Sequence, residues 1–229
     1  KENDIFKSNE INLVSIASYD NFHFNQIIKC IKSNKNIIVE KPMCMNLDQL
    51  KLIFKLLKQN KKIKMTSNLV LRTTSLFKSF KKKINTNDLY YVEGDYIWGR
   101  RNKLYGWRSK IKNYSVTLGA GIHMIDLIMW LTQLKPKSVT AHANKKVTAK
   151  SKFKKNSFVI MIFSFPKNIL VKITANTSAV FKHFHEVKLF SKDNTLINNI
   201  SGSYLYKNDK LVKSDKKYPD KVKRKKAIY

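Results

Sequence analysis

The chain has 229 residues and a mass of 26.8 kDa, and 43% of its residues are hydrophobic, so it can fill one large core or two small ones and is not a disordered chain. Its formal net charge of +31 suggests a polyanionic partner, but 41 of its 46 cationic residues are lysine. Proteins that read nucleic acids rely on the planar guanidinium of arginine, so we interpret most of this charge as solvated surface.

The cysteines and the hydrophobic pattern limit the class of protein further. Cys30 and Cys44 are too few for a disulfide framework or a four-ligand zinc site, so we expect no metal and a reducing compartment. No apolar run approaches the ~20 residues that span a bilayer, and the first residues lack a signal-peptide profile. We therefore expect a soluble, cytoplasmic protein without a membrane partner. Because the chain begins with Lys1 rather than Met, we also expect it to be processed or incomplete.

The first third of the chain predicts a parallel α/β unit. Short apolar runs at residues 11–17 and 36–40 are typical of strands buried on both faces of a parallel sheet, and residues 62–67 predict a third strand. Between these runs, apolar residues recur at helical spacing over residues 24–31 and 46–60. The order strand, helix, strand, helix, strand is typical of a right-handed parallel α/β fold.

The rest of the chain predicts an α+β region with a mostly antiparallel open sheet. A helix at residues 75–84 precedes an aromatic strand at 89–98, and a polar loop then leads to a second helix at 119–132. Five further strands follow, separated by short polar turns, at residues 137–143, 157–165, 169–176, 185–190 and 195–200. This succession predicts an antiparallel meander with helices on one face.

These patterns divide the chain into three parts. We expect residues 1–70 to form the parallel α/β domain and residues 71–206 to form the α+β domain. Residues 207–229 carry ten cations up to Lys226 with few apolar residues between them, so we expect a loose basic tail there. The expected fold class is therefore α/β, with a parallel sheet followed by an α+β domain.

Lys41 stands in the sharpest local motif, Glu40-Lys41-Pro42, at the carboxyl end of the second predicted strand. Ligands of open α/β sheets bind outside this edge, so a lysine there is placed to act on a ligand. The other interpretation is that Lys41 is one more lysine in a turn between a strand and a helix, and its position alone favours that interpretation.

His123 is the second candidate. It lies in a run from Gly119 to Asp126 that begins a helix with small residues, where a backbone can approach a ligand closely. Asp126 follows three residues later on the same helix face, so its carboxylate would fix the tautomer of His123. A lone histidine on an apolar helix is more often a core residue whose hydrogen bonds are satisfied, and both interpretations stay open on this pattern alone.

Four motifs together resemble those of the Gfo/Idh/MocA oxidoreductases, the family of glucose-fructose oxidoreductase and inositol dehydrogenase. They follow the family's order and spacing within residues 12–143, at Ile16-Ala17-Ser18 followed by His23, at residues 36–42, at Trp107-Arg108, and at Gly121-Ile122-His123-x-x-Asp126. The resemblance implies that residues 1–70 are the remainder of a Rossmann domain and that residues 71–206 carry the substrate and subunit contacts. It also implies that copies associate as a homo-oligomer through the open sheet.

The same resemblance implies an oxidoreductase that moves a hydride between NAD or NADP and a hydroxyl of a sugar or sugar derivative. Lys41 would hydrogen-bond the reacting hydroxyl and His123 would take its proton, so both are expected to be catalytic and to bind the substrate. Trp107 and Arg108 would also face the substrate, and Arg108 would favour an acidic or phosphorylated sugar, such as a sugar nucleotide. The expected cofactor contacts are Ser18, His23, Glu40, Lys41, Asn68 and Arg72.

The chain departs from the family's pattern in three places. It has no Gly-x-Gly-x-x-Gly loop, Gly119 stands where relatives have an aspartate, and Ser18-Tyr19-Asp20 replaces Thr-Pro-Asn. The alternative hypothesis is therefore a catalytically inactive family fragment, trimmed at both ends, or an inactive partner subunit. A basic nucleic-acid-binding protein is a further alternative, which the even spread of lysine along the chain argues against.

Overall fold

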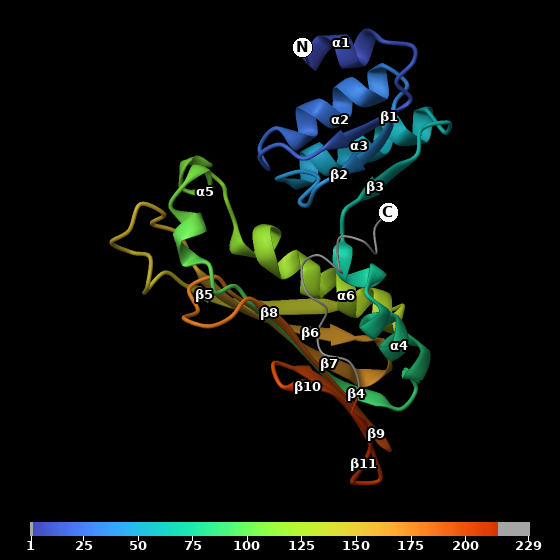
Figure 1. The fold of residues 1–229 in the computed structure, drawn as a ribbon, viewed down its shortest axis with the longest axis vertical. Coiled ribbons are helices and arrows are strands. Elements are labelled where there is room, and N and C mark those ends of the chain that lie inside the picture. The colour runs from blue at the N-terminus through green and yellow to red at the C-terminus, as the bar shows by residue number, and fades with distance from the viewer. Residues whose placement is uncertain (1, 215–229) are drawn as a thin grey trace. The chain divides into compact units, whose positions relative to one another are not determined.

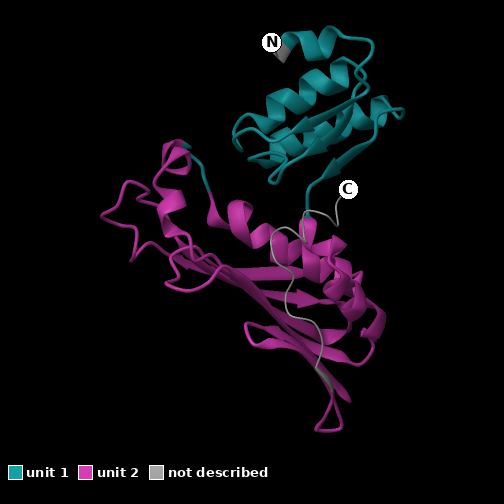
Figure 2. Cartoon of the chain, in the orientation of Figure 1, with its two compact units in different colours: residues 1–69, 111–114 teal, residues 70–110, 115–229 magenta. Residues whose placement is uncertain are grey.

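The computed structural model describes residues 2–214, which divide into two compact units (Figure 1; Figure 2). Unit 1 contains the residues up to 69 together with residues 111–114. Unit 2 contains residues 70–110 and the residues from 115 onward. The sequence predicts a boundary at residue 70 and assigns residues 111–114 to the second domain, whereas the structure groups that short segment with unit 1.

Unit 1 is a three-stranded parallel sheet packed with helices. Its elements are, in chain order, α1 (Glu2–Lys7), β1 (Leu13–Ile16), α2 (His23–Lys32), β2 (Asn36–Val39), α3 (Leu47–Gln59) and β3 (Met65–Ser67). The strands lie in the order β1-β2-β3 and run parallel, which confirms the predicted α/β pattern. Ile27 on α2, Ile37 and Val39 on β2, and Ile53 on α3 belong to its buried core.

Strand β1 differs from the expectation of a strand buried on both faces. Of its four residues only Ile16 is buried, and Leu13 is 49% exposed. Within the described sheet β1 is an edge strand that pairs with β2 alone, so fewer side chains cover it than cover β2. An apolar run in the sequence therefore marks the strand but not how many neighbours it has.

Unit 2 is built on an eight-stranded sheet with the order β11-β10-β9-β8-β4-β7-β6-β5. The strands are β4 (Leu89–Ile97), β5 (Ser138–Asn144), β6 (Phe158–Phe165), β7 (Ile169–Asn176), β8 (Phe184–Ser191), β9 (Asn194–Asn199), β10 (Gly202–Lys207) and β11 (Lys210–Ser214). The prediction of a mostly antiparallel sheet is confirmed, but that of a simple meander is wrong. Strand β4 lies between β7 and β8, parallel to β7 and antiparallel to β8. Two meanders therefore flank β4, which is the first strand of this sheet in chain order.

Strands β10 and β11 occupy residues that the sequence leaves outside the sheet. We expect a loose tail from residue 207, but Lys210–Ser214 forms β11 and pairs with β10. The turn between them contains Asn208 and Asp209 with φ values of 45° and 62°, the conformation that two-residue hairpin turns require. The rest of the expected tail, residues 215–229, lies outside the described residues.

The helical segments of unit 2 are η1 (Val70–Thr73), α4 (Ser75–Lys83), η2 (Arg101–Leu104), α5 (Trp107–Lys110), the π-helical turn η3 (Thr117–Gly121), α6 (Ile122–Thr132) and the turn η4 (Pro166–Asn168). Helices α4 and α6 cover one face of the sheet (Figure 1). Gly94 on β4 lets α6 come close, because a Cβ there would lie 2.9 Å from Ile128 Cδ1 and 3.1 Å from Met124 Cε. No helix within residues 2–214 has both the length and the apolar character to cross a membrane.

Candidate functional site

The carboxyl ends of the three strands in unit 1 bring together polar residues from separate parts of the sequence. Glu40 follows β2, where its N–H donates to Ile16 O at 2.9 Å, and Asn68 follows β3, where its N–H donates to Val39 O at 2.8 Å. The Asn68 side chain then donates to Glu40 Oε1 at 2.7 Å. Hydrogen bonds that continue past the strands thus hold a carboxylate and an amide side by side, at the edge where open α/β sheets bind ligands.

His23 connects the loops that follow β1 and β2. Its side chain is fully buried, with Nδ1 2.7 Å from Pro42 O and Nε2 3.1 Å from Ser18 O. A neutral imidazole carries one N–H, so in that form it donates to one of the two carbonyls and the tautomer decides which. The structure gives His23 an anchoring role between the loops, and its contact with a cofactor stays a prediction.

Ser18 and Lys41 complete this set of residues. The Ser18 hydroxyl donates to Gln26 Oε1 at 2.6 Å, which connects the end of β1 to α2. Lys41 is half-buried and precedes Pro42 through a cis peptide bond. Five of the residues that we expect to bind the cofactor lie at this edge of the sheet: Ser18, His23, Glu40, Lys41 and Asn68.

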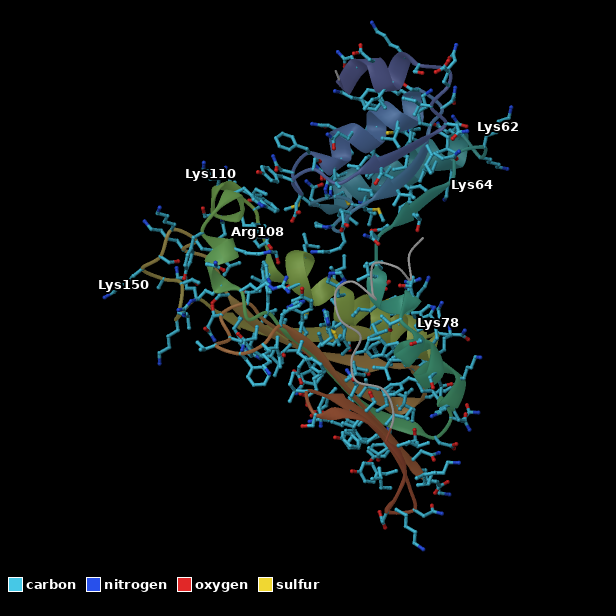
Figure 3. All side chains as sticks on the ribbon, viewed as in Figure 1. Lys62, Lys64, Lys78, Arg108, Lys110 and Lys150 are labelled. Carbon is cyan, nitrogen blue, oxygen red and sulfur yellow. The ribbon has the colours of Figure 1, made fainter. Side chains whose placement is uncertain are left out.

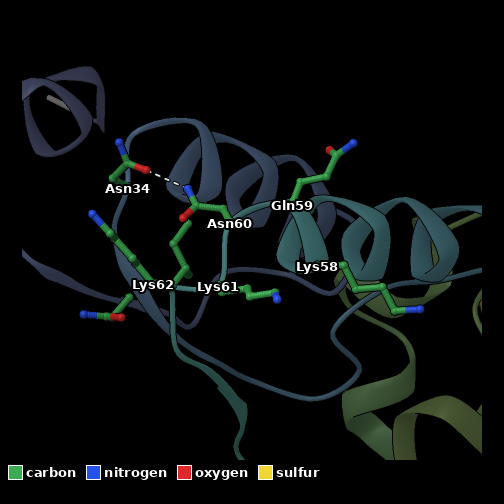
Figure 4. A pocket seen from close by; sticks show the side chains of 8 residues that line it. Asn34, Lys58, Gln59, Asn60, Lys61 and Lys62 are labelled. Atoms are coloured by element: carbon green, nitrogen blue, oxygen red, sulfur yellow. Dashed lines mark hydrogen bonds between the residues drawn. The ribbon is translucent and has the colours of Figure 1, made fainter.

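Unit 1 also has a pocket of about 720 Å³ near the amino end of β2 (Figure 4). Lys58, Lys61 and Lys62 line it, and Asn60 Nδ2 donates to Asn34 Oδ1 at 2.7 Å across it. Figure 4 shows the amino groups of Lys58 and Lys62 pointing to different sides rather than to a common centre. Because ligands of open α/β sheets bind at the carboxyl ends of the strands, this pocket adds no residue to the candidate site.

His123 is the second residue of α6 in unit 2, and α6 follows the turn η3 directly. It is 8% exposed, and its ring stacks on Tyr96 of β4 with centroids 5.7 Å apart and planes 5° from parallel. A Cβ at Gly121 would lie 3.3 Å from Met161 Cε and 3.5 Å from Ala175 Cβ. The small residues at this helix start therefore let the backbone approach the sheet. From the sequence we expect them to let the backbone approach a ligand.

Two histidines that the sequence argument misses lie beside His123. His185 of β8 is the cross-strand partner of Tyr96, with ring centroids 4.7 Å apart, and His183 lies 5.4 Å from the same ring. The one signal in the sequence is the spacing of His183 and His185, which places both on one face of a strand. Within residues 2–214, no group of His, Cys, Asp and Glu has the arrangement to hold a metal ion.

Arg108 lies against two tryptophan rings in unit 2. Its Cζ is 4.1 Å from the ring centroid of Trp107 and 5.1 Å from that of Trp98. Its Nη1 donates weakly to Lys103 O at 3.4 Å. Stacked guanidinium groups keep donors at their edges for an anion. The contact between Trp107 and Arg108 is a finding of the structure, and the role of both residues toward a substrate stays a prediction.

Arg72 and Asp126 are bonded to each other, a pairing that the sequence does not predict. We expect Asp126 to orient His123 and Arg72 to contact a cofactor. Within unit 2, Arg72 Nε donates to Asp126 Oδ2 at 2.7 Å, and Nη2 donates to Oδ1. This hydrogen bond raises the pKa of Arg72 above its ordinary value. The pair fixes η1 to α6, and contact between Arg72 and a cofactor stays a prediction.

The lysines of the described chain are spread over many elements. Figure 3 shows Lys62 and Lys64 of unit 1, and Lys78, Lys110 and Lys150 of unit 2, on separate turns, helices and loops. All five are exposed. This distribution favours the interpretation of the charge as solvated surface over that of a nucleic-acid footprint.

The candidate residues form two separate sets, one in each unit. Unit 1 holds Lys41 among the ends of the parallel strands, and unit 2 holds His123 on the covered face of the large sheet. That Lys41 and His123 act on one substrate stays a prediction.

Comparison with known proteins matches both units to one family. A model described as an oxidoreductase family with an NAD-binding Rossmann fold, GFO_IDH_MocA, matches residues 2–68. A model of the GFO/IDH/MocA C-terminal domain matches residues 86–197. No curated protein matches the chain.

Solved structures share the fold at low sequence identity. Myo-inositol 2-dehydrogenase from Lactobacillus plantarum is 15% identical, with a TM-score of 0.78 over 86% of this chain and 60% of its own. An inositol dehydrogenase homologue from Azotobacter vinelandii, complexed with NAD+, is 13% identical, with a TM-score of 0.81 over 93% of this chain and 59% of its own. A levoglucosan dehydrogenase in complex with NADH and levoglucosan is 16% identical, with a TM-score of 0.78 over 91% and 60%. The chain spans about 60% of the length of the first of these proteins.

Proposed function

We propose a function from one premise: the chain belongs to the Gfo/Idh/MocA oxidoreductase family, because models of both family domains match it in order. The function is that of a dehydrogenase, dependent on NAD or NADP, which acts on a hydroxyl of a sugar or cyclic polyol. One observation carries the proposal: Asn68 is hydrogen-bonded to Glu40, the neighbour of Lys41, at the carboxyl ends of the parallel strands, within the unit that matches the NAD-binding model. Open α/β sheets bind ligands at this edge. Solved proteins with this fold are named for inositol and levoglucosan.

The residues at this edge fit one half of a nicotinamide dinucleotide. Glu40 offers carboxylate acceptors and Asn68 offers amide groups, which suit the hydroxyls of a ribose. When bound, the cofactor supplies the hydride acceptor or donor. The sequence holds no glycine-rich loop for the pyrophosphate, so we propose that these residues bind the nicotinamide and ribose end.

We assign the proton chemistry to Lys41 and His123. The ammonium of Lys41 would donate a hydrogen bond to the reacting hydroxyl and stabilise the negative charge that grows on its oxygen. The imidazole of His123 would accept the hydroxyl proton, a role that suits a side chain which titrates near neutrality. The stacking of His123 on Tyr96 supports this role, because it fixes the ring before a substrate binds.

Arg108 supports a preference for an acidic or phosphorylated sugar. Its guanidinium is held between Trp98 and Trp107, and a planar fork of this kind pairs with carboxylate or phosphate through two hydrogen bonds. The tryptophan faces would also pack against the apolar faces of a sugar ring.

The test is NADH or NADPH binding followed by turnover with the 229-residue chain. We expect either cofactor to quench tryptophan emission, and myo-inositol or a sugar acid to be oxidised with release of reduced cofactor. Lys41→Ala and His123→Ala should each lower kcat by about 100-fold or more without abolishing cofactor binding. Lys62→Ala and His142→Gln change an exposed lysine and an exposed histidine and serve as matched controls. Absence of quenching and turnover would favour the alternative of an inactive partner subunit.

We also propose that two copies associate through the open face of the unit 2 sheet. On this face Ile162 is 43% exposed and Leu170 is 50% exposed. Beside them, Glu93 accepts hydrogen bonds from Tyr91 Oη at 2.9 Å and Lys188 Nζ at 3.1 Å. Burial, together with the hydrogen bond to Glu93, raises the pKa of Tyr91 to about 12. A face that combines exposed aliphatic groups with paired charges of both signs is complementary to a copy of itself.

We propose that the protein works in a reducing, cytoplasmic compartment, because its cysteines do not form a disulfide. Cys30 is buried and Cys44 is half-buried, and the two thiols are not joined in a disulfide. Desolvation raises the pKa of the Cys44 thiol, which favours the unreactive protonated form.

A further inference from the structure

Three of the five histidines of the chain surround one tyrosine in unit 2. Tyr96 stacks in parallel on His123, and the rings of His185 and His183 meet Tyr96 edge-on at interplanar angles of 77° and 67°. His183 and His185 are also 60 or more residues away from His123 in the sequence. We call His123, His185 and His183 the histidine cluster.

The rings of the histidine cluster form a chain from a buried end to a more exposed end. The centroids of His123 and His185 are 6.1 Å apart, and those of His185 and His183 are 5.1 Å apart. His123 is 8% exposed and His185 is 3% exposed, whereas His183 is only half-buried. With ring centroids this far apart, a proton would pass from one imidazole to the next through a bridging water.

Strand β8, which carries His185, lies between β4 and β9, and side chains of β9 and β10 fix it on the side away from β4. Buried Asn198 donates from Nδ2 to His185 O at 2.8 Å, and the buried Ser203 hydroxyl donates to Asn198 Oδ1 at 3.1 Å. Strand β8 is also paired with β4, where Tyr96 lies directly across from His185. The position of His185 is therefore set by contacts with the strands β4, β9 and β10 and not by a surface loop.

The charged residues of the same strands point to the other face of the sheet. Glu93 and Asp95 of β4, Lys172 of β7, and Glu186 and Lys188 of β8 alternate with the residues that face α6, and they pair with one another.

Two charged side chains carried by helices of unit 2 have partners of their own. Asp126 of α6 is bonded to Arg72, and Arg108 lies over Trp98. The rings that contact one another from α6, β4, β8 and the loop before β8 are three imidazoles and one phenol. Imidazole is the side chain that accepts and releases protons near neutrality, so this set is suited to passing protons rather than to holding a fixed charge.

We propose that His185 and His183 carry the proton that His123 takes from the substrate hydroxyl, an inference that rests on the proposed dehydrogenase function. The O–H bond of the substrate breaks as an N–H bond forms on His123. An N–H bond of His123 then breaks as one forms on His185, and the proton passes from His185 to His183 and on to water. The hydride leaves with the cofactor, so each oxidation releases one proton through this path. Tyr96 acts as a positioning residue that holds the rings in order.

The first test measures coupling between the histidines without cofactor or substrate. The full chain is labelled with 15N histidine, the imidazole signals are assigned by single variants, and each ring is titrated by NMR. We expect His185→Phe, which keeps an aromatic ring of similar size, to move the titration midpoint of His123 by roughly half a pH unit or more. His183→Gln should move the midpoint of His185. His142→Gln on β5, the matched control, should move neither.

The second test measures turnover. His183→Gln and His185→Phe should lower kcat by on the order of tenfold, change its pH profile and leave KM nearly unchanged, and added imidazole should restore part of the rate of His183→Gln. Turnover with uncoupled titrations, or variants with wild-type pH profiles, would overturn the relay. Coupled titrations in a chain without any turnover would instead reject the dehydrogenase function. Binding of one equivalent of Zn2+ by the cluster in the same NMR experiment would also overturn the relay in favour of a metal site.

Discussion

The two units hold their candidate residues by different kinds of contact. In unit 1, side chains bond to the main chain and to each other at the ends of neighbouring strands, as His23 does with Pro42 O and Asn68 with Glu40. In unit 2, rings pack on rings, as His123 and His185 do on Tyr96. The first arrangement joins loops at the ends of consecutive strands, 19 and 28 residues apart in the sequence, whereas the second depends on which strands of a large sheet are neighbours.

This difference predicts how a substitution in each unit should affect its candidate residues. A hydrogen bond between two loops is lost when one partner is removed, and the loops then separate. Removal of a ring from a packed cluster leaves a cavity. Its cost in unfolding free energy depends on how far the neighbouring side chains relax. Disruption of unit 1 should therefore spread along its loops, and disruption of unit 2 should lower the stability of the sheet.

The largest effect should come from His23→Ala. The change removes a fully buried ring and leaves Pro42 O and Ser18 O without it, so we expect the free energy of unfolding of unit 1 to fall by about 3 kcal/mol. Amide hydrogen exchange checks this, because β1 and β2 should lose protection while β4 and β8 keep theirs. His142→Gln alters an exposed histidine of unit 2 and should leave all four strands unchanged. Undiminished protection in β2 would contradict the anchoring role of His23.

A smaller effect should follow from Asn198→Ala in unit 2. The change leaves His185 O and the Ser203 hydroxyl without their buried partner, so we expect a loss of about 2 kcal/mol in unfolding free energy. Urea unfolding followed by tryptophan emission measures it, since Trp98, Trp107 and Trp130 all belong to unit 2.

The control for Asn198→Ala is Thr140→Ala on β5, which changes an exposed residue and should cost less than about 0.5 kcal/mol. Equal midpoints for the two variants would mean that Asn198 does not hold β8, and the comparison between the two units would then rest on the rings alone.

The sequence predicts the half of the site in unit 1 better than the half in unit 2. Glu40 and Lys41 follow one predicted strand and Asn68 follows the next, and the carboxyl ends of parallel strands share an edge, so their proximity follows from the pattern. The partnership of Tyr96 with His185 has no such local signal. Tyr96 and His185 are partners because β4 lies next to β8. The spacing of apolar residues does not predict the order of strands in an antiparallel region.

The same reason separates the parts of the fold that were predictable from those that were not. Periodicity finds α3 and β7 within a few residues, because burial of one face imposes it. The placement of β4 between β7 and β8, the edge position of β1, and the pairing of β11 in a lysine-rich segment all depend on contacts between distant residues. Arg72 shows the limit for side chains, because its partner Asp126 is 54 residues away.

The smallest effect on folding should come from Leu170→Lys, which compares the two faces of the unit 2 sheet. On the covered face Val92 and Ile173 are at most 1% exposed, whereas Leu170 on the open face is 50% exposed. The charge should therefore cost the fold less than about 0.5 kcal/mol, yet it would be buried without a partner if a second copy covers that face. Sedimentation should show a dimer for the wild type and a monomer for Leu170→Lys, while Leu52→Lys, an exposed leucine on α3, should stay dimeric. A wild-type chain that sediments as a 26.8 kDa monomer, or a Leu170→Lys dimer, would show that this face is open to water and not to another copy.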